Sequence, residues 1–306
     1  MAEGQHRGRE LAAAFRRVGA WSFALQQHGA AEEQRAVAEL EAMGYPAIWI
    51  PEGLGGKEAF SHAALLLAGS RSIVVATGIA NVYARDPMAM ANGARALGEA
   101  YPGRFLLGLG VSHASTVVQR GHQYGRPVES MRAYLDHMDA ARYTGPELDV
   151  PPGRVLAALG PRMLALAAER TDGAHPYFVP VEHTAMARAA LGPVPFLAVE
   201  QTAVLSSEPA EARGIAREFA TRYLDLPNYA NNLRRMGYSD EDVVGGGSDR
   251  LIDAVIAWGG VEDIAGRVLS HLDAGADHVC IQFRAADAAD LCLPQFAELA
   301  ALLIGR

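Results

Sequence analysis

The chain has 306 residues, half of them hydrophobic, with 27 basic and 35 acidic residues and a net charge of −8. This composition supports a large buried core and excludes wholesale disorder. The acidic balance and the lack of a Lys/Arg run argue against nucleic-acid binding, and no stretch of about 18 apolar residues predicts a membrane span.

The termini and cysteines indicate the compartment. The first 17 residues include four arginines but no apolar segment of the signal-peptide type, so we expect a cytoplasmic protein. Cys280 and Cys292 lack metal-binding spacing, and Cys280 lies in an apolar run. We therefore expect a buried free thiol rather than a disulfide, which fits a reducing compartment.

Short apolar runs alternate with longer amphipathic segments along the chain. The apolar runs are predicted strands: Val18–Leu25, Ala47–Pro51, Ser72–Ala80, Phe105–Val111, Val155–Leu159, Ala174–Val179, Phe196–Leu205 and His278–Phe283. The segments between and after them are predicted helices: Glu32–Met43, Phe60–Ala68, Pro87–Ala100, Val128–Tyr143, Pro161–Arg170, Glu182–Leu191, Glu208–Leu224 and Leu293–Ile304. This α/β alternation predicts one (β/α)8 TIM-barrel domain over residues 1–306. An open doubly wound sheet is disfavoured, because no GxGxxG follows the first strand.

Two segments are longer than a minimal barrel needs. His113–Pro127 follows the fourth strand, and Asp225–Gly275 separates the seventh helix from the eighth strand. The second insertion contains predicted helices over Leu251–Trp258 and Glu262–Ala274. Long excursions at a barrel rim are usually lids or binding loops, so we expect both to border the active site.

Polar residues stand where several predicted strands end, which is where barrel enzymes carry their chemistry. Glu52 follows the second strand, Asn81 the third and His113 the fourth, while His175 and Gln282 lie in the sixth and eighth. Glu52 and His113 are the candidates for proton transfer. Burial raises the pKa of a carboxylate, and a histidine can give or take a proton near neutral pH. The alternative is that each forms structural hydrogen bonds to neighbouring backbone.

Gly160-Pro161-Arg162 follows the fifth strand and opens a helix. Glycine permits close approach, proline suits the first helical turn, and the free N–H groups favour an anion; an ordinary strand-to-helix turn has the same sequence. The ten histidines form neither HxH nor HExxH, so we expect no metal site. His175, His183 and His271 are interpreted by default as structural, with His175 the least secure of the three.

Several segments together resemble a known family: VGAWSFAL, IWIPEG, IVVATGIANVYARDP, RFLLGLGVSH, RVLAALGPRMLALAAERTDGAHPYFV and DHVCIQF. They are similar to the luciferase-like monooxygenase superfamily, in particular its probable coenzyme F420-dependent oxidoreductases, from about Val18 to Phe283. The resemblance implies a (β/α)8 barrel, a deazaflavin ring in its mouth and a homodimer. It is less specific for the flavin, which leaves FMN as an alternative cofactor.

The resemblance also implies roles for individual residues. Ala80, Asn81 and Val82 would form a bulge behind the ring, often marked in relatives by a non-proline cis peptide. The phosphate-bearing tail would cross Gly160, Pro161 and Arg162, with His175 also holding cofactor. The residues expected to border substrate, from the two long loops and the eighth strand, are Tyr124, Arg126, Asn228, Tyr229 and Gln282.

Sugar-phosphate dehydrogenases of the family place histidine after the second strand and glutamate after the fourth, whereas Glu52 and His113 reverse that order. Lys57 is the only lysine, which also argues against a sugar-phosphate substrate. The resulting hypothesis is hydride transfer between F420 and a small organic substrate, with His113 moving the proton and Glu52 assisting. The alternatives are an FMN-dependent monooxygenase, a non-catalytic flavin or deazaflavin carrier, and a metal-dependent lyase or hydrolase.

Overall fold

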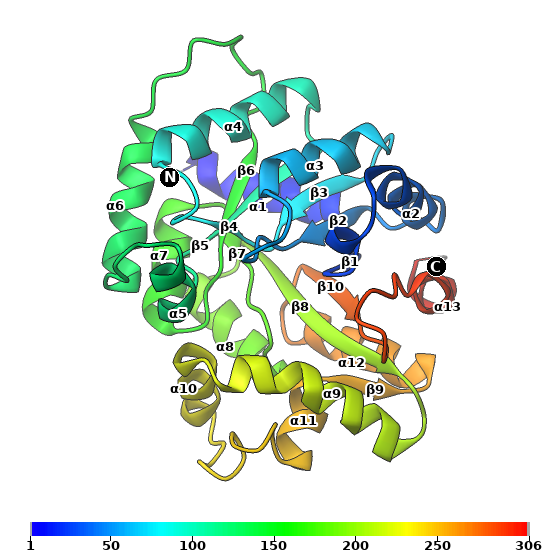
Figure 1. Cartoon of the computed structure of the whole chain (residues 1–306). Coiled ribbons are helices and arrows are strands. Elements are labelled where there is room, and N and C mark those ends of the chain that lie inside the picture. Colours follow the sequence, from blue (N-terminus) through cyan, green and yellow to red (C-terminus); the bar gives the residue numbers. More distant parts are fainter. Residues whose placement is uncertain (1, 305–306) are drawn as a thin grey trace.

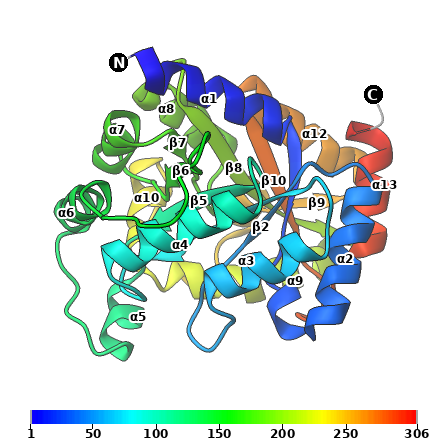
Figure 2. The same ribbon diagram turned by 90° about the horizontal axis from the view of Figure 1, so that it is seen from above.

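The computed structural model describes residues 2–304, in which parallel strands close into a barrel ringed by helices (Figures 1 and 2). The strands are β1 (Val18–Trp21), β2 (Ala47–Ile50), β3 (Val74–Thr77), β4 (Ala80–Asn81), β5 (Phe105–Gly110), β6 (Gly153–Leu156), β7 (Gly173–Ala174), β8 (Phe196–Leu205), β9 (Ala257–Gly259) and β10 (His278–Phe283). Strand β4 continues the line of β3, and β10 pairs with both β1 and β8. That double pairing closes the predicted eight-stranded barrel, while β9 lies outside it against the end of β8.

Helices follow nearly every strand. They are α1 (Ala2–Phe15), η1 (Leu25–Gln27), α2 (Ala30–Ala42), α3 (Ala59–Ala68), α4 (Pro87–Ala100), α5 (Ala114–Gln119), α6 (Pro127–Asp139), α7 (Pro161–Arg170), α8 (Val181–Leu191), α9 (Pro209–Leu224), α10 (Pro227–Arg235), α11 (Asp249–Val255), α12 (Val261–Asp273) and α13 (Leu293–Leu303). No described helix is both long and apolar enough to span a bilayer.

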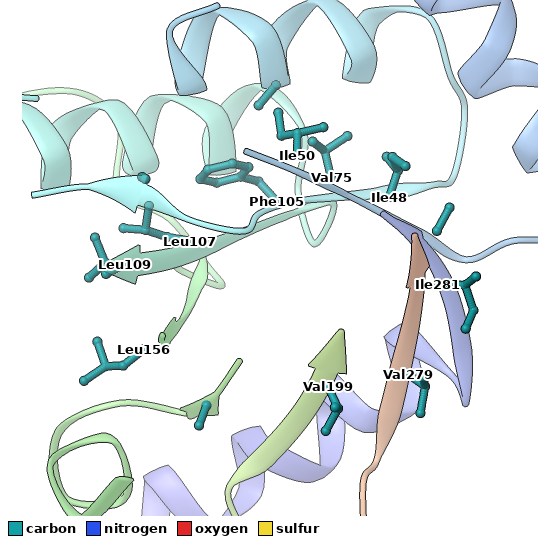
Figure 3. Packing of buried hydrophobic residues seen from close by; sticks show 14 of the residues in the cluster. Ile48, Ile50, Val75, Phe105, Leu107, Leu109, Leu156, Val199, Val279 and Ile281 are labelled. Atoms are coloured by element: carbon teal, nitrogen blue, oxygen red, sulfur yellow. The ribbon is translucent and has the colours of Figure 1, made fainter. Parts of the chain in front are cut away.

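The strands are buried on both faces. Their outward-facing aliphatic side chains pack beneath the helices, as Ile48, Leu107 and Val199 do in Figure 3. The interior holds a second apolar cluster that includes Trp49 and Phe196. Phe15, at the end of α1, packs onto both of those rings. Its ring centre lies 5.6 Å from that of Trp49 and 5.2 Å from that of Phe196. Helix α1 therefore closes the amino end of the barrel and leaves the carboxyl end for a site.

The carboxyl end of the barrel is covered by the insertion after β8. Helix α9 packs against β8, and α10 packs against α9 (Figure 1). Their Tyr223 and Tyr229 pack on Phe178 of the segment that follows β7. We call α9 and α10 together the cover helices. Helix α10 was not predicted, because its segment was interpreted as loop.

Two predicted boundaries are wrong. The expected strand Ala174–Val179 ends at Ala174, because Pro176 lacks an N–H group and Phe178 adopts a φ of 54°. The expected helix through Trp258 ends at Val255, after which β9 begins. Cys280 is a buried free thiol, as predicted, and Cys292 is also free and buried.

Candidate active site at the barrel mouth

Glu52 lies directly beyond β2 with its side chain 3% exposed. One carboxylate oxygen accepts a 2.7 Å hydrogen bond from the backbone N–H of Asn81, and the other accepts one from Ala59 at 3.2 Å. The guanidinium of Arg85 bonds to both oxygens. This carboxylate therefore ties the end of β2 to β4, and its acceptor positions are already engaged.

Asn81 is held on several sides. It pairs with Gly110 across the β4–β5 register, and its side-chain oxygen accepts a hydrogen bond from the N–H of Tyr83 at 2.9 Å. The cis peptide that the family resemblance led us to expect within Ala80–Val82 lies instead at Gly78–Ile79, just before β4.

Gly78 sits between two buried side chains. A Cβ atom at this position would lie 2.6 Å from Trp21 Nε1 and 3.0 Å from His175 Nε2. Neither nitrogen has a hydrogen-bond partner. Two unpaired polar atoms buried beneath one strand end mark a place where a polar ligand group or water belongs.

His175 follows β7 and is 1% exposed. Its ring stacks on Trp49, with centres 4.2 Å apart and planes 16° from parallel. Burial lowers the pKa of His175 to about 4, although the hydrogen bond from Nδ1 to the carbonyl of Ala198 opposes that shift. The ring is therefore neutral near pH 7 and presents an Nε2 lone pair toward Gly78.

His113 lies three residues beyond β5 and is partly buried. Its Nδ1 lies 3.1 Å from Oδ1 of Asn228 on α10, and its ring centre is 5.7 Å from that of Tyr229. Burial lowers the pKa of His113; the hydrogen bond with Asn228 raises it, and the charge of Arg222 lowers it further. A neutral imidazole with Nδ1 donating to Asn228 leaves Nε2 able to accept a proton.

Tyr177 and Gln282 lie together inside the mouth. The Tyr177 hydroxyl donates to Oε1 of Gln282 at 2.8 Å and lies 3.0 Å from the hydroxyl of Tyr223. The amide nitrogen of Gln282 is buried without a partner. The sequence predicted Gln282 but missed both tyrosines, whose contact depends on how α9 folds over the barrel.

Glu200 is an acidic residue that the sequence analysis did not single out. It is 1% exposed on the inner face of β8, where it accepts hydrogen bonds from Thr202 Oγ1 at 2.6 Å and from the N–H of Phe178 at 3.1 Å. Burial raises its pKa to about 7, although both hydrogen bonds oppose that shift. The signal was a lone acidic residue within the predicted strand FLAVEQTAVL.

The turn after β6 caps a helix as predicted. Gly160 is the N-cap of α7 and Pro161 its first residue, while Arg162 is exposed. A Cβ atom on Gly160 would lie 3.4 Å from a guanidinium nitrogen of Arg235, on α10. The sequence did not predict Arg235, which adds a positive charge to the helix N-terminus.

The long loop after β5 contributes less than expected. The hydroxyl of Tyr124 donates to the carbonyl of Ser112 at 3.2 Å, which keeps its ring near the end of β5. Arg126 is 83% exposed and pairs with Glu129 one helical turn away, so the structure does not bring it to the other candidates. A groove of about 760 Å³ lies elsewhere, at the amino ends of the strands around Gly153 and Asp172.

Within residues 2–304, no group of three or more His, Cys, Asp or Glu side chains is arranged to hold a metal ion. The candidates that do gather lie at or just beyond the carboxyl ends of β2, β4, β5, β6, β7 and β10, at one end of the barrel.

Comparisons with known proteins give the same fold. The tetrahydromethanopterin reductase of Methanopyrus kandleri, described as coenzyme F420-dependent, aligns over 94% of this chain and 99% of its own, with a TM-score of 0.75 and 15% identity. An F420-dependent secondary alcohol dehydrogenase, solved with an F420–acetone adduct, aligns over 92% and 98%, with a TM-score of 0.70 and 13% identity.

Sequence comparison identifies a nearer relative and the family. A 5,10-methylenetetrahydromethanopterin reductase from Methanolobus tindarius is 28% identical over 149 residues. That match covers 44% of this chain and 46% of the relative, so it spans about half of each protein. The profile of the family described as luciferase-like monooxygenase matches residues 13–278. The chain therefore belongs to the luciferase-like monooxygenase family.

Proposed function

We propose that this protein is an oxidoreductase that moves a hydride between coenzyme F420 and a small organic substrate. One observation carries the proposal: a neutral histidine, His113, and the open N-terminus of α7 stand beyond adjacent strands at the covered end of the barrel. The first suits proton transfer and the second suits a phosphate. The F420-dependent enzymes among the structural relatives support the same cofactor.

The residues present fit such a cofactor. Trp21 Nε1 and His175 Nε2 are buried polar atoms without partners, on either side of Gly78. At the other end, Arg162 and Arg235 stand at the N-terminus of α7, and neither forms an ion pair with a carboxylate in the described part of the chain. A flat polar ring with a phosphate tail would engage both ends.

Each part of the mouth then has a task. When bound, F420 supplies the ring carbon that takes or gives the hydride. The backbone of Ala80, Asn81 and Val82 would support the ring, and the turn from Gly160 to Arg162, with Arg235, would hold the phosphate. His175 would bond to the ring edge through Nε2.

The proton accompanying the hydride would pass through Nε2 of His113. Glu52 would act as a positioning residue, since Arg85 and two backbone N–H groups already engage its carboxylate. The cover helices would exclude water, and the substrate would lie against side chains that line their underside or the adjacent strand ends: Tyr124, Asn228, Tyr229 and Gln282.

Titration with F420 and with FMN tests the proposal, with binding followed by visible absorbance. We expect saturable binding of F420 and none of FMN, and oxidation of reduced F420 when a substrate is present. Binding of FMN alone, with oxygen consumption, would instead make the protein a monooxygenase. Binding of F420 without turnover of any substrate would indicate a carrier.

A further inference from the structure

A second cavity lies at the covered end of the barrel, on the side away from α7. It has a volume of about 240 Å³ and opens between the segment after β1, the segment after β10 and the inner side of α9. Its apolar lining includes Phe23, Ile215 and Phe219, and its charged lining includes Arg222, Arg284 and Glu218. None of these six residues is assigned a role in the cofactor site above.

Both arginines are held on aromatic rings. The guanidinium carbon of Arg222 lies 5.8 Å from the ring centre of Phe23, and that of Arg284 lies 5.3 Å from the ring centre of Phe219. Such stacking fixes the plane of a guanidinium while leaving its N–H groups free to bond at the edge. Two guanidinium groups thus lie near aromatic rings at the wall of one cavity, with Arg222 exposed and Arg284 partly buried.

Neither arginine has a charge partner in the part of the chain that the structure describes. Among the described residues, no carboxylate lies within 4 Å of either guanidinium, although most other arginines near carboxylates, such as Arg213 and Arg217, form ion pairs within that distance. The Nε of Arg284 is buried without any hydrogen-bond partner. Unpaired guanidinium donors at a cavity wall are suited to an incoming anion.

The cavity is linked to the candidate proton-transfer group through the cover helices. Arg222 precedes Tyr223, whose ring centre lies 5.2 Å from that of Tyr229, and the Tyr229 ring centre lies 5.7 Å from that of His113. The positive charge of Arg222 contributes to the lowered pKa of His113, after the larger effect of burial. An anion bound to Arg222 would therefore lie within electrostatic reach of the imidazole. The two arginines and Glu218 sum to a single positive charge, which favours a monoanion over a doubly charged phosphate.

We propose that this cavity binds the carboxylate of an organic acid, with Arg222 and Arg284 as its partners, and that the substrate of the hydride transfer carries that carboxylate. The apolar wall of Phe23, Ile215 and Phe219 would receive its hydrocarbon part. This inference rests on the proposed function only for the statement about substrate; the anion site itself stands on the cavity.

Benzoate and benzamide are the probes, since they share a shape and differ in charge. Calorimetry on the cofactor-free protein should show saturable binding of benzoate, with benzamide at least tenfold weaker. Arg222→Gln and Arg284→Gln should each weaken benzoate binding about tenfold, since each removes a charge-assisted contact. Arg71→Gln, an exposed arginine just before β3, is the control and should change the affinity less than twofold.

Each other result decides against the proposal. Equal binding of benzamide, no binding of benzoate, or insensitivity to both substitutions would overturn it, provided that thermal unfolding shows the variants folded. Inorganic phosphate that displaces benzoate and binds more tightly would make the site a phosphate site and also overturn it.

F420 titration of the same variants separates this inference from the proposed function. If the wild type binds benzoate but not F420, the proposed function fails and the anion site stands. If F420 binds and benzoate does not, the proposed function stands and the carboxylate site fails. Arg222→Gln and Arg284→Gln should bind F420 as the wild type does, because neither residue lies in the proposed cofactor site.

Discussion

His113 and Asn228 are joined by a hydrogen bond of 3.1 Å between Nδ1 and Oδ1, although they are 115 positions apart in the chain. The bond connects the segment after β5 to the cover helix α10. Because the amide oxygen accepts, the proton of a neutral His113 resides on Nδ1 and Nε2 carries the lone pair. The hydrogen bond from α10 thus leaves Nε2 as the nitrogen of His113 that can accept a proton.

Replacing His113 with alanine should lower kcat for F420-linked turnover by about 10²–10⁴-fold, the usual contribution of a general base. F420 affinity should change little, and unchanged turnover with intact binding would remove His113 from the mechanism. In the direction of substrate oxidation, the wild-type rate should fall as pH drops through the pKa of His113, which lies below 6.5. The hydrogen bond to Asn228 raises the pKa of His113. Removing it in Asn228→Ala should therefore lower that pKa and move the acid limb of the pH–rate profile to lower pH.

Glu52→Gln should destabilise the fold by about 3 kcal/mol, because Arg85 would remain buried with its main partner neutralised. The side chains of Glu52 and Arg85 are 3% and 10% exposed. Glu129→Gln is the matched control: it breaks an exposed pair with Arg126 and should cost less than about 1 kcal/mol. Urea unfolding measures both. Equal losses of unfolding free energy in the two variants would mean that Glu52 stabilises the fold no more than an exposed charge does.

Much of the fold follows from local sequence signals. Helices Pro87–Ala100 and Pro161–Arg170 begin and end where predicted, and a proline in the first turn marks the start of each. Strands Phe196–Leu205 and His278–Phe283 also match, as long apolar runs buried on both faces.

The unpredicted elements depend on tertiary contacts. Helix α10, PNYANNLRR, contains three asparagines, which are weak helix formers. It is stabilised by burying Tyr229 and Leu233 against α9 and the segment after β7, which no local pattern specifies. Arg235, Tyr223 and Arg222 belong to these two cover helices, so their approach to the barrel could not be predicted either. Glu52 and His113 could be proposed from the sequence alone because they follow shortly after strand ends.

Arg235→Gln should weaken F420 binding about tenfold if its guanidinium assists the N-terminus of α7 in holding phosphate. The neighbouring Arg234→Gln is the control, since Arg234 pairs with Asp240 at 2.6 Å and is 41% exposed. Raising the ionic strength should reduce wild-type affinity more than that of the Arg235 variant, because one screened attraction has been removed. Equal losses in both arginine variants would indicate a general charge effect instead of a specific contact.

Glu200 should make the stability of the protein depend on pH. Its pKa is raised from 4.5 to about 7 in the folded state, since it is buried among Tyr177, Tyr223, Tyr229 and Cys280. Below pH 4.5 the carboxyl is protonated in both states. Between pH 4.5 and 7 the unfolded chain releases the proton while the folded chain keeps it, so rising pH favours unfolding.

The wild type should therefore lose roughly 3 kcal/mol of unfolding free energy, relative to Glu200→Gln, as pH rises from 4.5 to 7.5. Urea denaturation of both proteins at the two pH values measures this difference, and every other titrating group cancels in the comparison. The variant should also keep its circular dichroism spectrum, since glutamine still offers an acceptor to the N–H of Phe178. A difference that stays constant with pH would show that the carboxyl ionises in the folded protein at its ordinary pKa. In that case the buried tyrosines would surround a carboxylate anion held by Thr202 and Phe178 alone.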